Sequence, residues 1–161
     1  MPAKEPSLPR LFVACAPQDL KFSELIAAKA RADRLPLVFD GFGEGRFDEI
    51  GWQLECRRRI RSARALVVLM SPHTSESPRA LWQVRCAREL GLPVVGVTVS
   101  FEDGGAGGCG EVVGMESIVG WKWKTIAAML MRFAAVSAPK SDRAVGDVSP
   151  ARGHASQGSA A

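Results

Sequence analysis

The sequence predicts an α/β domain in which a five-stranded parallel sheet, in the order 2-1-3-4-5, lies between two layers of helices. Short apolar runs and amphipathic segments alternate five times along the chain. The runs are apolar throughout instead of alternating with polar residues, which is typical of parallel strands buried on both faces. Strands joined by helical crossovers in this way favour a three-layer sandwich with right-handed connections.

The first half of the chain contains two expected strands and two expected helices. Residues 11–15 form a continuous apolar run that ends before Pro17, and residues 35–40 form the second strand. A helix is expected over 21–33, where the apolar positions recur at helical spacing: Phe22, Leu25, Ile26 and Ala30. A second helix is expected over 49–63, with its core positions at Trp52, Cys56 and Ile60.

The second half begins with the most apolar strand, 65–70, which we expect at the centre of the sheet. Ser77 is expected to cap the next helix and Pro78 to open it, because these residue types suit the cap and the first helical position. Gly91 is expected to end that helix in the left-handed conformation. The remaining expected elements are strands at 93–99 and 116–120 and a helix at 122–135.

The 161 residues leave room for one domain and a tail. We expect an N-terminal extension over 1–9, the α/β domain over 10–136 and a disordered tail over 137–161. The tail consists of Ala, Ser, Gly, Pro and isolated charges, which cannot bury a core. A glycine-rich loop is expected at 104–110.

The composition favours some partners and excludes others. No apolar run is long enough to span a membrane and the first residues lack a secretory signal, so we expect a cytoplasmic protein with no membrane partner. The net charge is +4, but the arginines gather on one amphipathic helix, which indicates a solvated face or a contact for an acidic partner instead of a nucleic-acid groove. The four cysteines are scattered, so neither a metal site nor a disulfide framework is expected.

In the predicted sheet order a ligand binds at the carboxyl ends of the strands, near the switch between the first and third strands. Three loops are expected to meet there, at residues 16–19, 41–47 and 71–78. The third strand ends without a carboxylate, which excludes a phosphoacceptor site, and the first strand is not followed by a glycine-rich dinucleotide motif.

The segment 71–97, SPHTSESPRALWQVRCARELGLPVVGV, resembles the TIR-like family of bacterial defence proteins, including the NAD-cleaving subunit of Thoeris systems. The matching residues lie between positions 73 and 93 without a gap: His73, Thr74, Ser77, Trp82, Ala87, Glu89, Leu90, Gly91 and Pro93. The resemblance covers about residues 10–136. It implies a flavodoxin-like, TIR-like three-layer sandwich with NAD as substrate and no other cofactor.

In that family a glutamate after the tryptophan is needed to cleave the bond between nicotinamide and ribose. Breaking this bond builds positive charge on the ribose, which a carboxylate stabilises. The position is Gln83 here, and we expect its side chain at the edge of the buried stripe, pointing into the cleft. The chain is then an engineered Glu→Gln variant, a natural member that binds without cleaving, or one in which another carboxylate, Glu76 or Glu89, does the work.

Six further residues are candidates for substrate binding: Cys15, Asp19, Asp40, Phe47, His73 and Trp82. Each has a structural alternative. Cys15 can be a buried thiol, Trp82 plain core, and His73 a cap for the following helix. Aspartates are common in turns for backbone reasons. The first loop lacks the acidic run usual in the family, which weakens the transfer of NAD contacts to it.

These observations lead to one functional hypothesis and two alternatives. The first is a TIR-like antiphage-defence module that binds NAD and, with a glutamate at position 83, would cleave it to nicotinamide and a linear or cyclic ADP-ribose-type signal. It would self-associate and act with a sensor-effector protein that responds to the product. The alternatives are a non-catalytic assembly module and an enzyme similar to nucleoside deoxyribosyltransferases, which would need acidic residues near the end of the third strand.

Overall fold

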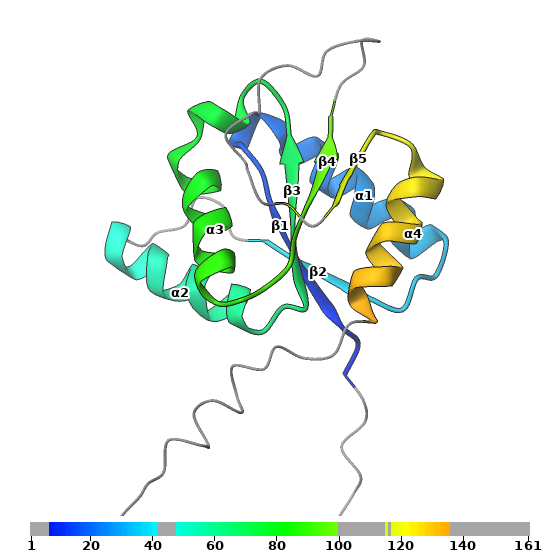
Figure 1. Ribbon diagram of the computed structural model, residues 1–161, viewed down its shortest axis with the longest axis horizontal. Helices are drawn as coiled ribbons and strands as arrows, with labels where there is room; N and C mark the ends of the chain where they lie inside the picture. Colours follow the sequence, from blue (N-terminus) through cyan, green and yellow to red (C-terminus); the bar gives the residue numbers. More distant parts are fainter. Residues whose placement is uncertain (1–6, 42–47, 100–114, 116, 136–161) are drawn as a thin grey trace, which may run out of the picture.

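A five-stranded parallel sheet in the order β2-β1-β3-β4-β5 forms the centre of the protein (Figure 1). The computed structural model describes residues 7–41, 48–99, 115 and 117–135. Its strands are β1 (Arg10–Ala14), β2 (Val38–Asp40), β3 (Ala65–Met70), β4 (Val94–Thr98) and β5 (Ser117–Val119). Its helices are α1 (Leu20–Ala32), α2 (Glu49–Arg61), α3 (Pro78–Glu89) and α4 (Trp123–Ala134), with short 3-10 turns η1 (Pro17–Asp19) and η2 (Thr74–Glu76). The predicted fold class and strand order are confirmed.

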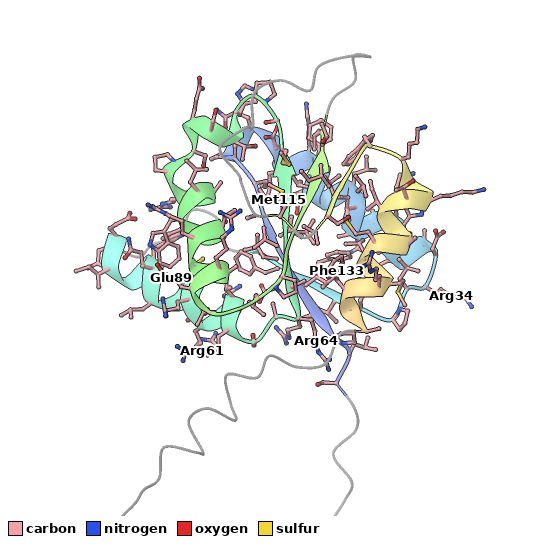
Figure 2. All side chains as sticks on the ribbon, in the orientation of Figure 1. Arg34, Arg61, Arg64, Glu89, Met115 and Phe133 are labelled. Atoms are coloured by element: carbon pink, nitrogen blue, oxygen red, sulfur yellow. The ribbon has the colours of Figure 1, made fainter. Side chains whose placement is uncertain are left out.

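Successive residues of each strand point to opposite faces of the sheet, and each face has its own apolar cluster. Leu11 of β1 belongs to the cluster under α1 and α4, whereas its neighbour Phe12 belongs to the cluster under α2 and α3. Both side chains are fully buried. The two helix pairs lie on opposite sides of the sheet in Figure 1. Figure 2 shows Glu89 on the α2–α3 side and Phe133 on the α4 side.

The predicted signals at the two ends of α3 are confirmed, whereas α2 ends at Arg61, two residues before the predicted end. Ser77 accepts a hydrogen bond from the backbone N–H of Ala80 at 3.3 Å, and Pro78 opens α3. Asp48 caps α2 in the same way, through the N–H of Gly51 at 2.7 Å. Gly91 follows α3 with φ = 76°, a conformation that other residues adopt at a cost.

Strand β2 is shorter than the sequence predicts, because only Val38–Asp40 pairs with β1. The backbone N–H of Leu35 bonds back to the carbonyl of Ala30 at 2.9 Å, so residue 35 completes the end of α1 instead of entering the sheet. Pro36 has no N–H to donate to a strand. The register pairs Phe12 with Asp40, so β2 ends beside the middle of β1.

Several predictions fall on residues outside the described ranges. These are the extension before residue 7, most of the loop at 41–47 with Phe47, the loop at 104–110, and the tail beyond residue 135. Among the helices that the structure describes, none has the length and apolar character needed to cross a bilayer.

Candidate functional site

The carboxyl ends of β1 and β3 carry a buried polar pair, Asp19 and Ser71. Asp19 ends the turn η1, in which its backbone N–H bonds to the carbonyl of Ala16 at 2.9 Å. Ser71 follows β3 directly. The two side chains are 3% and 6% exposed, and the Ser71 hydroxyl donates a hydrogen bond to Oδ2 of Asp19. Residues 52 positions apart thus meet at the predicted switch point between the first and third strands.

A hydroxyl-rich turn holds Ser71 in place. Its backbone N–H donates to Oγ1 of Thr74 at 2.9 Å, and Thr74 in turn donates to the carbonyl of Leu69 at 2.9 Å. The Ser71 hydroxyl also accepts from the backbone N–H of His73 at 3.0 Å. Thr74 is completely buried. The Ser71 oxygen is therefore fixed from both sides, and its proton is directed at Asp19.

One oxygen of the Asp19 carboxyl group has no partner among the described residues. Oδ2 accepts from Ser71, while no residue in the described part of the chain donates to Oδ1. Leaving a buried polar oxygen without a hydrogen bond costs about 1–3 kcal/mol. Most such groups in proteins have a partner, and each exception needs an explanation, such as strain or a functional role.

Cys15 lies at the same edge, directly after β1, and is half-buried. Burial, followed by the nearby charge of Asp19, raises the pKa of its thiol to about 11. At neutral pH the sulfur is therefore protonated and is a poor nucleophile. Its surroundings are consistent with the predicted alternative of a buried thiol that lines the edge of the sheet.

His73 is exposed at this edge, between Ser71 and η2. Its imidazole caps neither η2 nor α3, since η2 has no side-chain cap and Ser77 caps α3. The capping role considered for His73 is therefore filled by Ser77. Its backbone N–H is what contributes to the Asp19–Ser71 pair.

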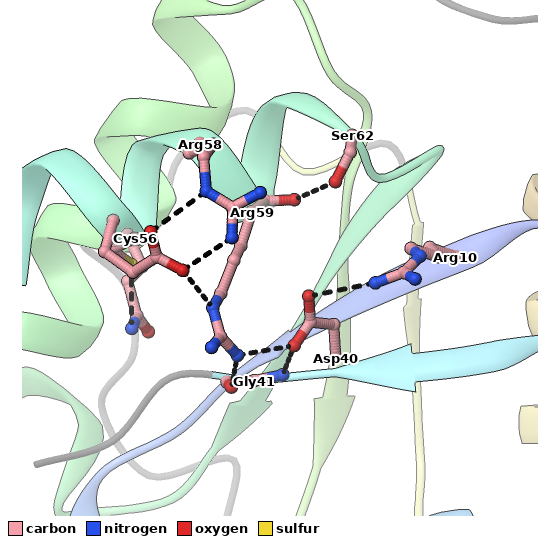
Figure 3. Close-up of polar contacts among 9 residues, drawn as sticks. Arg10, Asp40, Gly41, Cys56, Arg58, Arg59 and Ser62 are labelled. Carbon is pink, nitrogen blue, oxygen red and sulfur yellow. Dashed lines mark hydrogen bonds and ion pairs between the residues drawn. The ribbon is translucent and has the colours of Figure 1, made fainter. Parts of the chain in front are cut away.

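Asp40 is held by arginines and does not join Asp19 (Figure 3). Oδ1 accepts from Arg59 of α2 at 3.1 Å and from the backbone N–H of Gly41 at 2.9 Å, and Oδ2 lies 3.7 Å from Arg10. Because β2 is short, Asp40 lies level with Phe12, two residues before β1 ends. The expectation that it faces the same site is corrected: its carboxylate ties β2 to α2.

Trp82 packs against Trp52 of α2, with ring centroids 5.3 Å apart, and is half-buried. The guanidinium of Arg79 lies over Trp52 at 4.6 Å from the ring centroid. Trp82 therefore packs between α2 and α3, in agreement with the alternative that it is a core residue. The cation–π interaction of Arg79 with Trp52 stabilises the packing of the same two helices.

Gln83 lies in the same helix contact. Its side chain is 3% exposed, and Nε2 lies 3.4 Å from Sγ of Cys56 on α2. Burial is the largest influence on Cys56 and raises the pKa of its thiol to about 12, so the sulfur is protonated at neutral pH. Gln83 thus belongs to the buried stripe of α3 with Ala80 and Ala87, and its part in a binding site stays a prediction.

The other two carboxylates considered for catalysis are exposed. Glu76 lies in η2, and Glu89 forms an ion pair with Arg57 at 3.4 Å at the far end of α3. Within the described residues no group of three or more His, Cys, Asp or Glu side chains is placed to hold a metal ion.

Asp19 was predicted as a candidate from the sequence, whereas Ser71 and Thr74 were not. A serine directly after the most apolar strand, with a threonine three positions on, is the signal that could have identified them. The carboxyl group that reaches the end of β3 comes from another loop, which the sequence did not indicate.

No family model and no curated protein matches the chain. Among solved structures, the chain is similar to the TIR domains of the activated Roq1 resistosome that recognises the pathogen effector XopQ. The TM-score is 0.44 and the identity 20%, over 56% of this chain and 57% of that one. It is also similar to a 3-dehydroquinate dehydratase-like protein from Bifidobacterium longum, with a TM-score of 0.43 and 18% identity, over 79% of this chain and 96% of that one. Neither likeness assigns the chain to a family or an activity.

Proposed function

We propose that this chain is a TIR-like module of bacterial antiphage defence that binds NAD or a related nucleotide and leaves it intact. The binding position is the edge where β1 and β3 end, at Asp19 and Ser71. The proposal rests on one observation above all: the carboxyl group of Asp19 is 3% exposed and keeps one oxygen without a donor in the described part of the chain.

A sugar hydroxyl is a ligand group that suits this oxygen. Carboxylates at the carboxyl ends of parallel strands bind ribose hydroxyls in dinucleotide-binding folds, where the hydroxyl donates and the carboxylate accepts. The Ser71 hydroxyl already occupies Oδ2 and fixes the plane of the group. Oδ1 would then accept one ribose hydroxyl, with Cys15 and His73 beside it.

The proposed absence of cleavage rests on the family resemblance, which puts the catalytic glutamate at position 83, where this chain has Gln83. Cleaving the bond between nicotinamide and ribose requires a charge that stabilises the positive ribose, and a buried neutral amide supplies none. Losing such a stabilising group costs about a hundredfold to a thousandfold in rate. A sensor-effector partner would in this case respond to the nucleotide-bound module and not to a product.

Isothermal titration calorimetry with NAD tests the binding. Wild type is expected to bind, and Asp19→Asn to bind at least about tenfold more weakly, because a charge-assisted hydrogen bond contributes about 1.5–3 kcal/mol. Glu24→Gln is the matched control, since it removes an exposed carboxyl group from α1. No binding by wild type, or equal binding by wild type and Asp19→Asn, would overturn the proposal.

Cleavage is measured separately with etheno-NAD, on wild type and on Gln83→Glu. Wild type is expected to be silent, and cleavage by wild type would overturn the second half of the proposal. If Gln83→Glu alone gains activity, position 83 is the catalytic position of the family, and α3 turns its side chain towards the ligand. Glu76→Gln then tests the remaining exposed carboxylate near the site.

A second candidate, a non-catalytic assembly module, is favoured by the outer side of α2. Ile50 and Leu54 lie one turn apart on that helix and are 71% and 67% exposed. Exposed apolar side chains that are adjacent in space are typical of interaction surfaces. Light scattering that shows self-association in wild type but not in Ile50→Ser/Leu54→Ser, together with no NAD binding, would favour this function over the first.

A further inference from the structure

The side of α3 that faces away from α2 carries a shallow groove. Its volume is about 380 Å³, and it is lined by Ser75 and Glu76 of η2 and by Pro78, Leu81, Val84, Arg85 and Arg88 of α3. We call the five α3 residues the α3 groove; Glu76 is the one carboxylate among the described residues at its border. It is a different surface from the Asp19–Ser71 site, which lies at the end of β1 and β3.

The two sides of α3 differ in what they contact. One side packs on α2, through Trp82 on Trp52 and through Gln83 at Cys56. The groove lies on another stripe, in which Pro78, Leu81, Arg85 and Arg88 recur at spacings of three and four residues. Residues at these spacings form one continuous face of a helix. The face extends over about 15 Å, at 1.5 Å for each residue.

The two arginines of the groove, like Arg61 of α2, have no anion partner in the described part of the chain. Four other arginines on α2 and α3 hold carboxylates: Arg57, Arg58, Arg59 and Arg79. Arg85 and Arg88 are exposed, and no residue in the described ranges forms a hydrogen bond or ion pair with either. Two guanidinium groups less than one turn apart are well placed to bind carboxylates, each through two parallel hydrogen bonds.

The floor of the groove is aliphatic. Val84 is 3% exposed and Leu81 is half-buried, so both present carbon atoms to an occupant without leaving their places. Binding of single-stranded nucleic acid uses aromatic side chains on which bases stack, and the groove lining includes no aromatic residue. An aliphatic floor beside two guanidinium groups fits leucine-like side chains with carboxylates next to them.

We propose that the α3 groove binds an amphipathic, acidic helical segment of a partner protein. Apolar side chains of the segment contact Leu81 and Val84, and its Glu or Asp side chains pair with Arg85 and Arg88. Recognition of this kind uses anchors at helical spacing on the bound segment. The inference does not depend on nucleotide binding, because none of these residues belongs to the Asp19–Ser71 site.

Fluorescence anisotropy with three labelled probes tests the proposal on the full chain. The first probe is a helical peptide with leucines at i, i+4 spacing and glutamates beside them; the second has lysines in place of the glutamates. The third is a single-stranded oligonucleotide with the charge of the first. Wild type is expected to bind the first peptide, and Arg85→Ala/Arg88→Ala to bind it about tenfold more weakly, with most of the binding lost in high salt.

Two further variants make the result specific. Leu81→Gln is expected to weaken binding of the acidic peptide as well, since it removes an apolar anchor. Arg31→Ala/Lys124→Ala removes two exposed charges on the α1–α4 side and is expected to bind like wild type. Circular dichroism confirms that each variant is folded.

Four binding results would overturn the proposal. These are no binding of the acidic peptide, equal binding of the acidic and basic peptides, tighter binding of the oligonucleotide, and unchanged binding by Arg85→Ala/Arg88→Ala. Self-association of wild type that this double variant abolishes would assign the groove to a second copy of the chain, and would overturn it too.

Discussion

Replacing Gln83 by glutamate tests where this side chain lies, independently of any activity. The amide is 3% exposed and its Nε2 faces Sγ of Cys56. The thiol of Cys56 is protonated at neutral pH, because burial raises its pKa to about 12, and it offers only a weak donor to a carboxylate. A carboxylate at position 83 would therefore be a buried charge that Cys56 does not compensate.

The expected cost has two parts. An uncompensated buried charge destabilises a protein by about 3–5 kcal/mol, and loss of the amide hydrogen bond by about 1 kcal/mol. Burial raises the pKa of the introduced carboxyl group above its value in the unfolded chain, about 4.3. The charge penalty is thus absent below that value, grows as the pH rises towards the raised pKa, and is constant above it.

Urea denaturation at several pH values between 4 and 8 measures this effect, as the free energy of unfolding of wild type minus that of Gln83→Glu. The difference is expected to be about 1 kcal/mol at the acidic end and about 4 kcal/mol or more at the other. Gln18→Glu, the same change at an exposed position, is the control and is expected to show almost no difference. Equal stability of Gln83→Glu and wild type at pH 8 would refute the burial argument and place the side chain in water.

Three further predictions concern α2. Trp52→Ala is expected to lower the free energy of unfolding by about 3–5 kcal/mol in urea denaturation, because the ring is 1% exposed; a loss below about 1 kcal/mol would contradict its place in the core. Hydrogen bonds from Arg58, the larger cause, and from Arg59 lower the pKa of Glu55 to about 2, so NMR titration of Glu55 should show a midpoint near pH 2. The stability that this pairing contributes should be lost only as the pH falls from about 4.5 towards 2. Arg58→Met/Arg59→Met should return the midpoint towards 4.5, and an unchanged midpoint would contradict the cause. Cys56 should resist iodoacetamide at pH 8 in the folded protein and react after unfolding, because its thiol is buried and protonated. Mass spectrometry measures the extent of modification, and rapid reaction in the folded state would contradict the burial of Cys56.

The sheet order and the helix ends could be predicted because local signals agree with the fold. Continuous apolar runs specified buried strands, and Ser77, Pro78 and Gly91 carry their cap functions in their own chemistry. Strand β2 was predicted too long because apolar residues at 35 and 37 suit a strand and a helix end equally well. The hydrogen bond from Leu35 to Ala30 decides between them.

The site was predicted less completely, because its geometry depends on contacts between distant residues. The position of Asp19 after β1 was enough to suggest it, but its pairing with Ser71 is not visible in the sequence. Asp40 occupies a similar position after β2, and its arginine partners give it a structural role instead. For Gln83 the spacing from Ala80 and Ala87 indicated the buried stripe, but its contact with Cys56 of α2 is not visible in the sequence.

The contact between Gln83 and Cys56 makes the evolution of position 83 depend on residue 56. A codon for glutamine becomes one for glutamate by a single base change, yet the protein that results would lose a large part of the 5–15 kcal/mol by which folded domains are stable. A change of residue 56, or of the spacing between α2 and α3, would lower that cost if it came first. The order of substitutions, more than their number, would decide whether a charge can appear at position 83.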